Sequence, residues 1–526
     1  MSHQNNNLAK YLLVLGGFAL TMVWFFRFTL FHSDYLQFGD HYEGFIQISI
    51  LEHWNNVLHG AAHWSRTNYL YPAQDTLALN DGYLLYGLLH ALFRSLSFDV
   101  LLSAELVNVV VRASGFWLLY AAARKIAGFD WRWALLASML FTVSNGIYEQ
   151  MFHAQLLSVS FAPGLALLLH AAARAMLEDR RKALFVWGLA FVLAYAAWLL
   201  TAFYMAWFFA FFLLIFVLFA PKDWLGAAGR HWPLLLLLAV LALIVDLPFL
   251  RLYLPAAMRT GGHDVSQALG FSPSLLDLVN VGDRNLLWGW FNAFLREHLR
   301  PGFPLHSELN TGFPPLLLAL FGISAVALRR DKMIRAAALA TIVSCALFMH
   351  VKGFSLYPLV HDYLPGASAV RAIARYQIFA AAPLIIVALA APARIGGLAL
   401  LLAVPLLAEE WNGDQIARIN RPYELQRLAS IPVPPAGCRA FYIAKDRGEA
   451  FLTKEISEIY SVSADAMLIA EVIRLPTING FASFLPPGYD LFRPEAADYS
   501  ERVRLYAEKN GVDGLCGLDL REMRWT

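Results

Sequence analysis

The stretch YLLVLGGFALTMVWFFRFTLFHSDYLQFGDHYE, residues 11–43, decides which class of protein this chain belongs to. Its part from Tyr11 to Phe31 is nearly all apolar and long enough to cross about 30 Å of hydrocarbon as a helix. This block is longer than the core of a signal peptide, and no small-residue cleavage site follows it, so we expect a retained membrane anchor. The acidic phrase FGDHYE at 38–43 follows within a few residues. A carboxylate is therefore expected at the mouth of the first membrane helix.

The composition of the whole chain agrees with this opening. Of its 526 residues, 59% are hydrophobic and only 15% are charged, whereas a soluble globular domain carries about 25% charged residues. The apolar residues fall in blocks of about 18–25, the length of a membrane span. We therefore expect an integral membrane protein. Its net charge of +2 provides no basic surface for nucleic acid, which we exclude as a partner.

The hydrophobic blocks predict an α-helical polytopic membrane protein with about eleven transmembrane helices and a small C-terminal α/β extracytoplasmic domain. Residues 1–409 would form the transmembrane domain and residues 410–526 the extracytoplasmic domain. The expected spans are 11–32, 100–123, 131–147, 156–174, 183–200, 203–220, 233–254, 313–328, 335–350, 376–392 and 396–409.

Positive charges in the short loops predict the orientation, because Lys and Arg accumulate in the cytoplasmic loops of membrane proteins. We expect the N-terminus on that cytoplasmic side, and an odd number of spans then places the C-terminal domain outside. The loops 33–99, 255–312 and 351–375 share the outer face with this domain. The residues that define the cytoplasmic side are Lys10, Arg124, Lys125, Arg132, Arg174, Arg180, Arg181, Lys182, Lys222, Arg230, Arg329, Arg330, Lys332, Arg335 and Arg394.

The outer segments contain patterns of their own. Residues 41–58 alternate apolar and polar positions at helical spacing and carry aromatics, which predicts a helix at the membrane interface. Residues 81–97 predict a second, shorter apolar helix. In the C-terminal domain we expect two strands, CRAFYIAK (438–445) and DGLCGLDL (513–520), and two helices, ADAMLIAEVIRL (464–475) and YSERVRLYAEKNG (499–511).

The chain has three cysteines. Cys345 lies inside an apolar span, where we expect it to serve packing. Cys438 and Cys516 both fall in the C-terminal domain, and an extracytoplasmic domain permits a disulfide between them. Two buried free thiols are the alternative, and the sequence leaves both open.

Asp40 is the first candidate catalytic residue, with Glu43 one helical turn further on. Transfer of a sugar to a hydroxyl needs a base for the hydroxyl proton, and a carboxylate suits that role. The alternative is that Asp40 caps a helix beginning at His41, as an Asp after Gly commonly does. The two roles are compatible.

Further candidates for substrate binding lie on the outer face. Asp81 marks a turn, and it is equally suited to cap the helix that follows. His153 and Gln155 lie in a tight connection between two spans, where a structural histidine is the alternative to a ligand. Tyr204 belongs to the next outer hairpin, and Glu308 precedes the eighth span.

Arg371 and Arg375 lie four residues apart in SAVRAIARYQIF, so a helix entering the tenth span would carry both on one face. Two arginines at that level fit a lipid phosphate or pyrophosphate held by paired hydrogen bonds. Anchoring to anionic headgroups is the alternative interpretation.

Three charged residues lie within predicted spans: Glu105, Arg112 and Asp246. Charge inside the membrane is costly and usually faces the bundle interior, so these residues could line a path for a lipid phosphate or a transport route. Alternatively, Glu105 pairs with Arg112, which is two helical turns away.

Several common sites are missing from the sequence. His53, His59 and His63 are too dispersed for a zinc site, and there is no CxxC pair. There is no GxxxxGK[ST] loop, and no GxGxxG follows a strand. We therefore predict no metal and no cofactor, and any group transferred must arrive on an activated donor delivered through the membrane.

Several phrases carry a resemblance across most of the chain. They are FGDHYEGFIQISILEHW (38–54), YLYPAQDTLALNDGYLLYGLLHALF (69–93), HAQLLSVSFAPGLALLLH (153–170), ELNTGFPPLLLALFGI (308–323), RAIARYQIFAAAPL (371–384) and NGFASFLPPGYDLF (479–492). In this arrangement the chain resembles the type C superfamily of membrane glycosyltransferases, within a largely uncharacterised bacterial group. These enzymes use polyprenyl-phosphate-linked sugars and carry a catalytic acidic residue in the first extracytoplasmic loop.

The resemblance implies that Asp40 is the catalytic base and that Glu308, Arg371 and Arg375 contribute to the donor or acceptor site. The chain departs from the paired acidic motif of many members, because His41 and not a second carboxylate follows Asp40. Glu43 is then the candidate second carboxylate, and His41 joins the candidate substrate-binding residues. We infer no metal from this pattern.

The expected function is a membrane glycosyltransferase that moves a sugar from a polyprenyl-phosphate donor to an extracytoplasmic glycan, glycolipid or protein acceptor. The expected location is the bacterial inner (cytoplasmic) membrane, with a periplasmic C-terminal domain. One alternative is a transporter or flippase of lipid-linked glycans that works through Glu105, Arg112 and Asp246. A second is a non-catalytic scaffold for envelope biogenesis.

Overall fold

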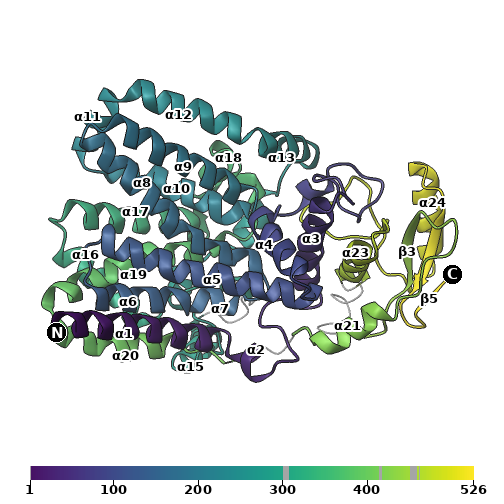
Figure 1. Cartoon of the computed structure of the whole chain (residues 1–526), viewed down its shortest axis with the longest axis horizontal. Helices are drawn as coiled ribbons and strands as arrows, with labels where there is room; N and C mark the ends of the chain where they lie inside the picture. Colours follow the sequence, from purple (N-terminus) through teal and green to yellow (C-terminus); the bar gives the residue numbers. More distant parts are fainter. Residues whose placement is uncertain (1, 300–306, 414–417, 450–458, 461) are drawn as a thin grey trace.

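Long apolar helices fill the N-terminal part of the chain, and a small three-stranded sheet lies near the C-terminus (Figure 1). The computed structural model describes residues 2–299, 307–413, 418–449, 459–460 and 462–526. Figure 1 shows the helix bundle on the left and the sheet with its helices on the right. We call the bundle end next to the sheet the domain end, and the opposite end, where the N-terminus lies, the far end.

Five helices are long and apolar enough to cross a membrane. Two bent pairs raise the number to seven if each pair is one span: α10 (Phe203–Phe219) with α11 (Lys222–Arg230), bent by 104°, and α12 (Trp232–Val245) with α13 (Leu247–Thr260), bent by 61°. The five single spans are Leu8–Phe25 within α1 (Ser2–Phe25), α5 (Val100–Lys125), the unit Ala154–Leu177 of η2 (Ala154–Phe161) and α8 (Ala162–Leu177), α9 (Arg181–Leu199), and Ile373–Ile395, which contains α19 (Tyr376–Ile395).

The structure thus confirms a helical chain with candidate membrane spans, but not the expected number of eleven. The other expected spans are helices of 12 to 17 residues or broken ones, shorter than the roughly 20 residues that cross a bilayer straight. These are α6 (Trp131–Thr142), which stops before α7 (Asn145–Glu149), then α16 (Pro315–Ala327), α17 (Lys332–Phe348), and η8 (Gly397–Leu402) with α20 (Ala403–Glu409).

Burial separates central helices from peripheral ones. The most apolar window of the span that contains α19 is 72% buried, whereas that of α1 is only 17% buried. α19 packs against α16, α17 and α6, so it forms the core of the bundle. Aspartates define several helix starts: the Asp99 side chain accepts from the backbone N–H groups of Leu101 and Leu102 at the start of α5.

The segment 41–58 forms helix α3 (Glu43–Leu58), but the expectation of an interfacial helix is wrong. α3 is buried on all sides, because α4 (Leu84–Ser95) packs against it and α23 (Val462–Ile473) of the C-terminal domain covers it as well. Its polar side chains are paired in the interior: Glu52 accepts from His90 and Arg94. The amphipathic pattern therefore serves contacts with the C-terminal domain and not with lipid headgroups.

The C-terminal domain has the expected strands and helices. Strands β3 (Ala440–Lys445) and β4 (Leu515–Asp519) are parallel, and β5 (Arg524–Trp525) pairs antiparallel with β4. Helices α21 (Arg421–Ala429), α23 and α24 (Tyr499–Asn510) complete it. Cys438 and Cys516, beside β3 and within β4, form a disulfide with a Cα–Cα distance of 5.8 Å, while Cys345 on α17 is free.

Shorter elements connect these parts. They are α2 (Arg27–Phe31), η1 (Thr76–Leu79), α14 (Val265–Gly270), η3 (Leu275–Val279), α15 (Gly289–Phe294), the π-helical turn Leu295–Leu299, η5 (Ser307–Leu309), β1 (His350–Val351), β2 (Phe354–Ser355), α18 (Tyr357–Tyr363), η6 (Ala367–Ala369) and η7 (Ile373–Arg375). Strands β1 and β2 form a separate antiparallel hairpin.

Candidate functional site

His153 is the centre of a charged cluster whose members come from distant parts of the chain. Its Nδ1 lies 3.7 Å from Glu43 Oε2, and its Nε2 lies 3.3 Å from Glu308 Oε1. His153 follows the turn after α7, Glu43 is the first residue of α3, and Glu308 lies in η5. The Glu43 side chain is 36% exposed, against 15% for His153 and 13% for Glu308. Glu43 is therefore the carboxylate of this cluster that solvent or a ligand reaches most easily.

Arg375 completes the cluster through a bidentate ion pair with Glu308. Its Nε donates to Glu308 Oε2 at 2.8 Å, and its Nη2 donates to Glu308 Oε1 at 2.6 Å. Such parallel hydrogen bonds between charged groups are among the strongest in proteins and fix the geometry of both side chains. We call Glu43, His153, Glu308 and Arg375 the charge relay set, a name that describes only their alternating signs.

Electrostatics supports alternating charges across this set. Burial and the nearby Arg375 lower the pKa of His153, but Glu43 and Glu308 outweigh both and raise it to about 9. Burial alone would raise the pKa of Glu308, yet Arg375 and His153 hold it well below its usual range. The pKa of Glu43 is also lowered, because His153 and Arg375 outweigh the effect of burial. At neutral pH the set is therefore negative, positive, negative, positive.

Asp40 lies beside this set in a loop that needs glycine. Gly39 has φ +88°, and a Cβ there would meet the Cα of Gly44 at 2.7 Å, so the chain doubles back tightly. Gly39 N–H donates to the Met151 carbonyl at 3.1 Å, which ties this loop to the turn that carries His153. The loop therefore places Asp40 and His153 in one region of the domain end.

The Asp40 carboxylate is buried, with 5% of the residue exposed. Its Oδ1 accepts from the backbone N–H groups of Tyr42 at 2.9 Å and Gly44 at 3.4 Å, so it supports the first turn of α3. The expectation that Asp40 is the N-cap of a helix beginning at His41 is wrong, because α3 begins at Glu43 and its N-cap is Tyr42. Burial raises the pKa of Asp40, with Glu43 adding to the rise, and the two N–H groups offset part of it.

Glu105 and Arg112 do not pair with each other. Glu105 Oε1 accepts from the Gln37 backbone N–H at 2.9 Å, and Oε2 accepts from that of Phe38 at 3.4 Å, so this carboxylate supports the loop that leads to Asp40. Arg112 donates to the Thr142 carbonyl at 2.9 Å and to that of Phe141, at the end of α6. Both side chains are buried, and both bind backbone groups.

Asp246, the third charge within a predicted span, lies at the bend between α12 and α13. Its Oδ1 is buried and has no hydrogen-bond partner among the residues that the structure describes.

His41 is turned toward the C-terminal domain. Its Nε2 lies 3.0 Å from Glu424 Oε1 on α21. Glu424 in turn accepts from Arg427 at 2.7 Å and from Arg447 at 2.8 Å, and Arg427 reaches Asp465 on α23 at 2.6 Å. Burial raises the pKa of Glu424, but His41 and the two arginines outweigh it and lower the value to about 2. The expectation that His41 binds substrate thus gives way to an interior ion network that sequence reasoning did not find.

Asp81, Gln155 and Tyr204 have structural partners near the set. Asp81 Oδ1 accepts from the Phe203 N–H at 2.8 Å and so caps α10, not the helix that follows it in sequence. Burial raises the pKa of Asp81 to about 6. Gln155 Oε1 accepts from the Tyr83 hydroxyl at 3.0 Å.

Arg371 and Arg375 do not share a helix face, because Arg371 precedes the 3-10 turn η7 and lies in non-helical chain. They meet instead at Tyr204. The backbone N–H of Arg371 donates to the Tyr204 hydroxyl at 2.8 Å, and the Arg375 guanidinium lies 5.7 Å from the centre of the Tyr204 ring. The Arg371 guanidinium lies over the ring of Phe271 at 5.5 Å, and within the described part of the chain it has no ion-pair partner. Arg371 is thus the exposed cation next to the set.

Among the described residues, no three His, Cys, Asp or Glu side chains are grouped as metal ligands. The chemistry that this site can perform with its own residues is proton transfer at a carboxylate and binding of an anion at Arg371.

Comparison with known proteins yields a match of fold. No protein-family model matches the chain, and no curated protein matches it. The structure is similar to that of an oligosaccharyltransferase from Archaeoglobus fulgidus in complex with Zn and sulfate, with 14% identity over 96% of this chain and 67% of that one, at a TM-score of 0.50. The same protein tethered to an acceptor peptide with the NVT sequon gives 13% identity over 95% and 68% of the two chains, at 0.49. At this level of identity the comparison shows that the chain shares its overall fold with that oligosaccharyltransferase.

Proposed function

We propose that this chain is a membrane glycosyltransferase that moves a sugar from a polyprenyl-phosphate donor to an extracytoplasmic glycan, glycolipid or protein acceptor. One observation carries the proposal: Glu43, His153, Glu308 and Arg375 converge at the domain end beside Asp40 and the exposed Arg371. A base and an anion site within one region are what transfer from a phosphate-linked donor needs.

In the reaction we propose, the acceptor hydroxyl oxygen attacks the anomeric carbon of the sugar. Its proton passes to Asp40, the new carbon–oxygen bond forms, and the bond between that carbon and the phosphate oxygen breaks with the electron pair on the phosphate. Direct displacement of this kind inverts the anomeric configuration. The raised pKa of Asp40 suits a base, because a base works best when its pKa lies near the working pH.

The other residues have roles that follow from their exposure. Arg371 is exposed and binds the leaving phosphate. Arg375 is held by Glu308, so it orients that carboxylate and contributes fixed positive charge near the phosphate. Glu43, the more exposed carboxylate, orients the acceptor. Tyr204 contacts both arginines and so fixes their relative positions.

The surrounding architecture supports an extracytoplasmic site. The Cys438–Cys516 disulfide is of a kind that persists in oxidising compartments, which fits a periplasmic C-terminal domain. The positive charges of the short loops favour the opposite, cytoplasmic side for the N-terminus. In this arrangement the protein lies in the bacterial inner membrane, and the donor reaches the site from the bilayer. The fold shared with an oligosaccharyltransferase agrees with sugar transfer at a membrane surface.

The test is a transfer assay on the purified full chain in detergent. A panel of radiolabelled polyprenyl-phosphate sugars is offered with total envelope lipid, envelope polysaccharide and envelope protein as acceptors. The wild type is compared with the double variant Asp40→Asn/Glu43→Gln and with Asp264→Asn, which removes an exposed aspartate that caps α14. We expect label in one acceptor class with the wild type and Asp264→Asn, and none with the double variant. Equal transfer by all three, or none by a folded wild type with any donor, would contradict the proposal.

A further inference from the structure

The uncharged segment LLWGWFNAF, residues 286–294, exposes its large apolar side chains although it lies outside the candidate membrane spans. Leu286 is 63% exposed and Trp290 66%, and Leu287 and Phe294 are exposed as well. We call these four side chains the aromatic patch. The Phe291 ring lies 5.7 Å from that of Trp290 and 6.5 Å from that of Phe294, so the aromatic side chains form one continuous surface. Exposed apolar patches of this kind usually mark an interaction surface.

The polar groups of the same segment face the protein. The Asn292 side chain donates to the Gly282 carbonyl at 2.7 Å, and Trp288 Nε1 donates to Glu409 Oε1 at 2.8 Å. Asn285, just before the segment, donates to the Glu409 carbonyl at 2.7 Å, and both asparagines are buried. A loop that faces water normally has the opposite arrangement, with polar groups outward. The segment is therefore suited to apolar surroundings.

The aromatic patch is continuous with a candidate membrane span. Trp24 lies in the last turn of the span Leu8–Phe25, and its ring is 5.0 Å from that of Trp411. The Trp411 carbonyl accepts from the Leu286 N–H at 2.9 Å. Figure 1 shows α15 beside this end of α1, whose Leu20 is also exposed. The patch thus lies at the level where the span ends.

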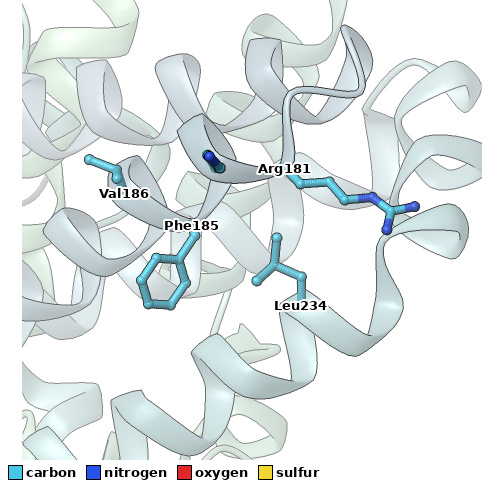
Figure 2. Close-up of a pocket in the computed structure, with 5 residues that line it drawn as sticks. Arg181, Phe185, Val186 and Leu234 are labelled. Carbon is cyan, nitrogen blue, oxygen red and sulfur yellow. The ribbon is translucent and has the colours of Figure 1, made fainter.

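The opposite boundary of the bundle has a cation in place of aromatic rings. The candidate span α9 begins at Arg181, and its first turns share a buried cluster with α11, which lies at the far end in Figure 1. Figure 2 shows Arg181 extending away from Phe185 and Val186. A long cationic side chain at a span end keeps its charge in water at the membrane boundary. The domain end, in contrast, presents an uncharged surface at the corresponding boundary.

We propose that the aromatic patch inserts into the leaflet of the bilayer on the domain side, at the level of the headgroups and the first acyl carbons. Trp side chains concentrate at this level, because the ring is apolar and its N–H is polar. The segment has no charge that would have to leave water. Its bonds to Glu409 connect the inserted segment to α20, so the loop is held at the membrane surface. The proposal depends on the membrane location of the chain and not on the transfer reaction.

The test is depth-dependent fluorescence quenching of the full chain in phosphatidylcholine nanodiscs. The free Cys345 is replaced by alanine, and a fluorophore is attached at Trp290→Cys or, separately, at Leu286→Cys. The matched control is Leu505→Cys, an exposed leucine on α24 in the C-terminal domain. Lipids with a nitroxide on the upper part of the acyl chain should quench the labels at 286 and 290 by about half. The label at 505 should be quenched by aqueous iodide and not by these lipids.

Three results would overturn the proposal. Quenching of the labels at 286 and 290 by iodide, and not by nitroxide lipids, would place the patch in water. Protection from both quenchers would mean that another protein chain, such as a second copy, covers it. A label at Leu20→Cys on α1 that escapes the nitroxide lipids would show that the level assigned to the patch is wrong. Elution volume and thermal unfolding verify that each labelled variant is folded.

Discussion

The charged side chains inside the helix bundle and those at its domain end differ in their binding partners. Arg112 and Glu105 are bound to backbone carbonyls and N–H groups, and each has less than 4% of its surface exposed. Glu43, His153 and Glu308 bind one another or Arg375 through side chains and keep part of their surface exposed. The first group supports the fold, while the second can exchange a partner for a ligand.

This difference bears on the rival function of a carrier. A transport path through Glu105 and Arg112 would have to break hydrogen bonds to buried backbone groups, at a cost of about 1–3 kcal/mol for each group left without a partner. At the domain end, a phosphate can approach Arg371 without breaking an ion pair among the described residues. The comparison therefore favours chemistry at the domain end, and the following variants test it.

Within the charge relay set, Glu308→Gln should have the largest effect on transfer. It removes the carboxylate that holds both Arg375 and His153, so both cations lose their positions. We expect the transfer rate to fall about a hundredfold, because misplacing catalytic groups by about 1 Å has that effect. The check is the initial rate per folded molecule. Glu178→Gln, which breaks an exposed pair with Arg174, is the control, and an equal fall there would remove the distinction between the two regions.

Glu424→Gln should destabilise the contact between the C-terminal domain and the bundle. Arg447 and Arg427 would keep their buried charges with less compensation, which costs about 3–5 kcal/mol when one partner of a buried pair is removed. We expect a clear fall of the thermal unfolding temperature in detergent. Glu522→Gln, which breaks the exposed pair with Arg524, serves as the control and should change little. No fall in Glu424→Gln would mean that the His41 network does not support the fold.

Arg112→Met should lower stability without lowering the rate of the folded protein. The Thr142 carbonyl would lose its donor, with an expected cost of about 1–3 kcal/mol, while the Phe141 carbonyl would keep the Ser144 N–H. Thermal unfolding measures the first effect, and the transfer rate normalised to folded protein measures the second. A rate loss comparable to that of Glu308→Gln would move the functional site into the bundle and favour the carrier.

For His153 we predict a smaller, pH-dependent effect on stability. Its pKa in the folded chain, about 9, lies above the usual value of about 6.5, so the protonated form stabilises the fold. That contribution is complete below about pH 6.5 and is lost as the pH rises through 9. The unfolding temperature of the wild type should therefore fall between pH 7 and pH 10, and the curve of His153→Gln should be flatter. Parallel curves would contradict the assigned charge state.

The sequence predicted much of this site because its residues stand at span ends, where the hydrophobic blocks stop. His153, Glu308, Tyr204 and Arg375 were candidates for that reason, and Glu43 was one because it follows Asp40 by one helical turn. The structure brings these five residues together. Hydrophobic length located the helices equally well, since α5, α9 and α19 lie where the apolar blocks predict them.

What the sequence did not predict depends on contacts between distant segments. His41 and Glu424 are separated by 383 residues, and no local pattern marks them as partners. α3 has an amphipathic pattern whether lipid or a domain covers it, so its burial under α23 has no sequence signal. The four-residue spacing of Arg371 and Arg375 predicted that both lie on one helix face. This prediction was wrong, because the chain forms a 3-10 turn there.

Single-residue variants in the transfer assay decide whether Asp40 removes the acceptor proton. Asp40→Asn keeps the size of the side chain and one oxygen to accept from the Tyr42 N–H, but it cannot take up a proton. We predict a transfer rate about a thousandfold below that of the wild type for Asp40→Asn, and a smaller loss for Glu43→Gln, with both variants folded. Transfer by folded Asp40→Asn at the wild-type rate would show that Asp40 is not the base.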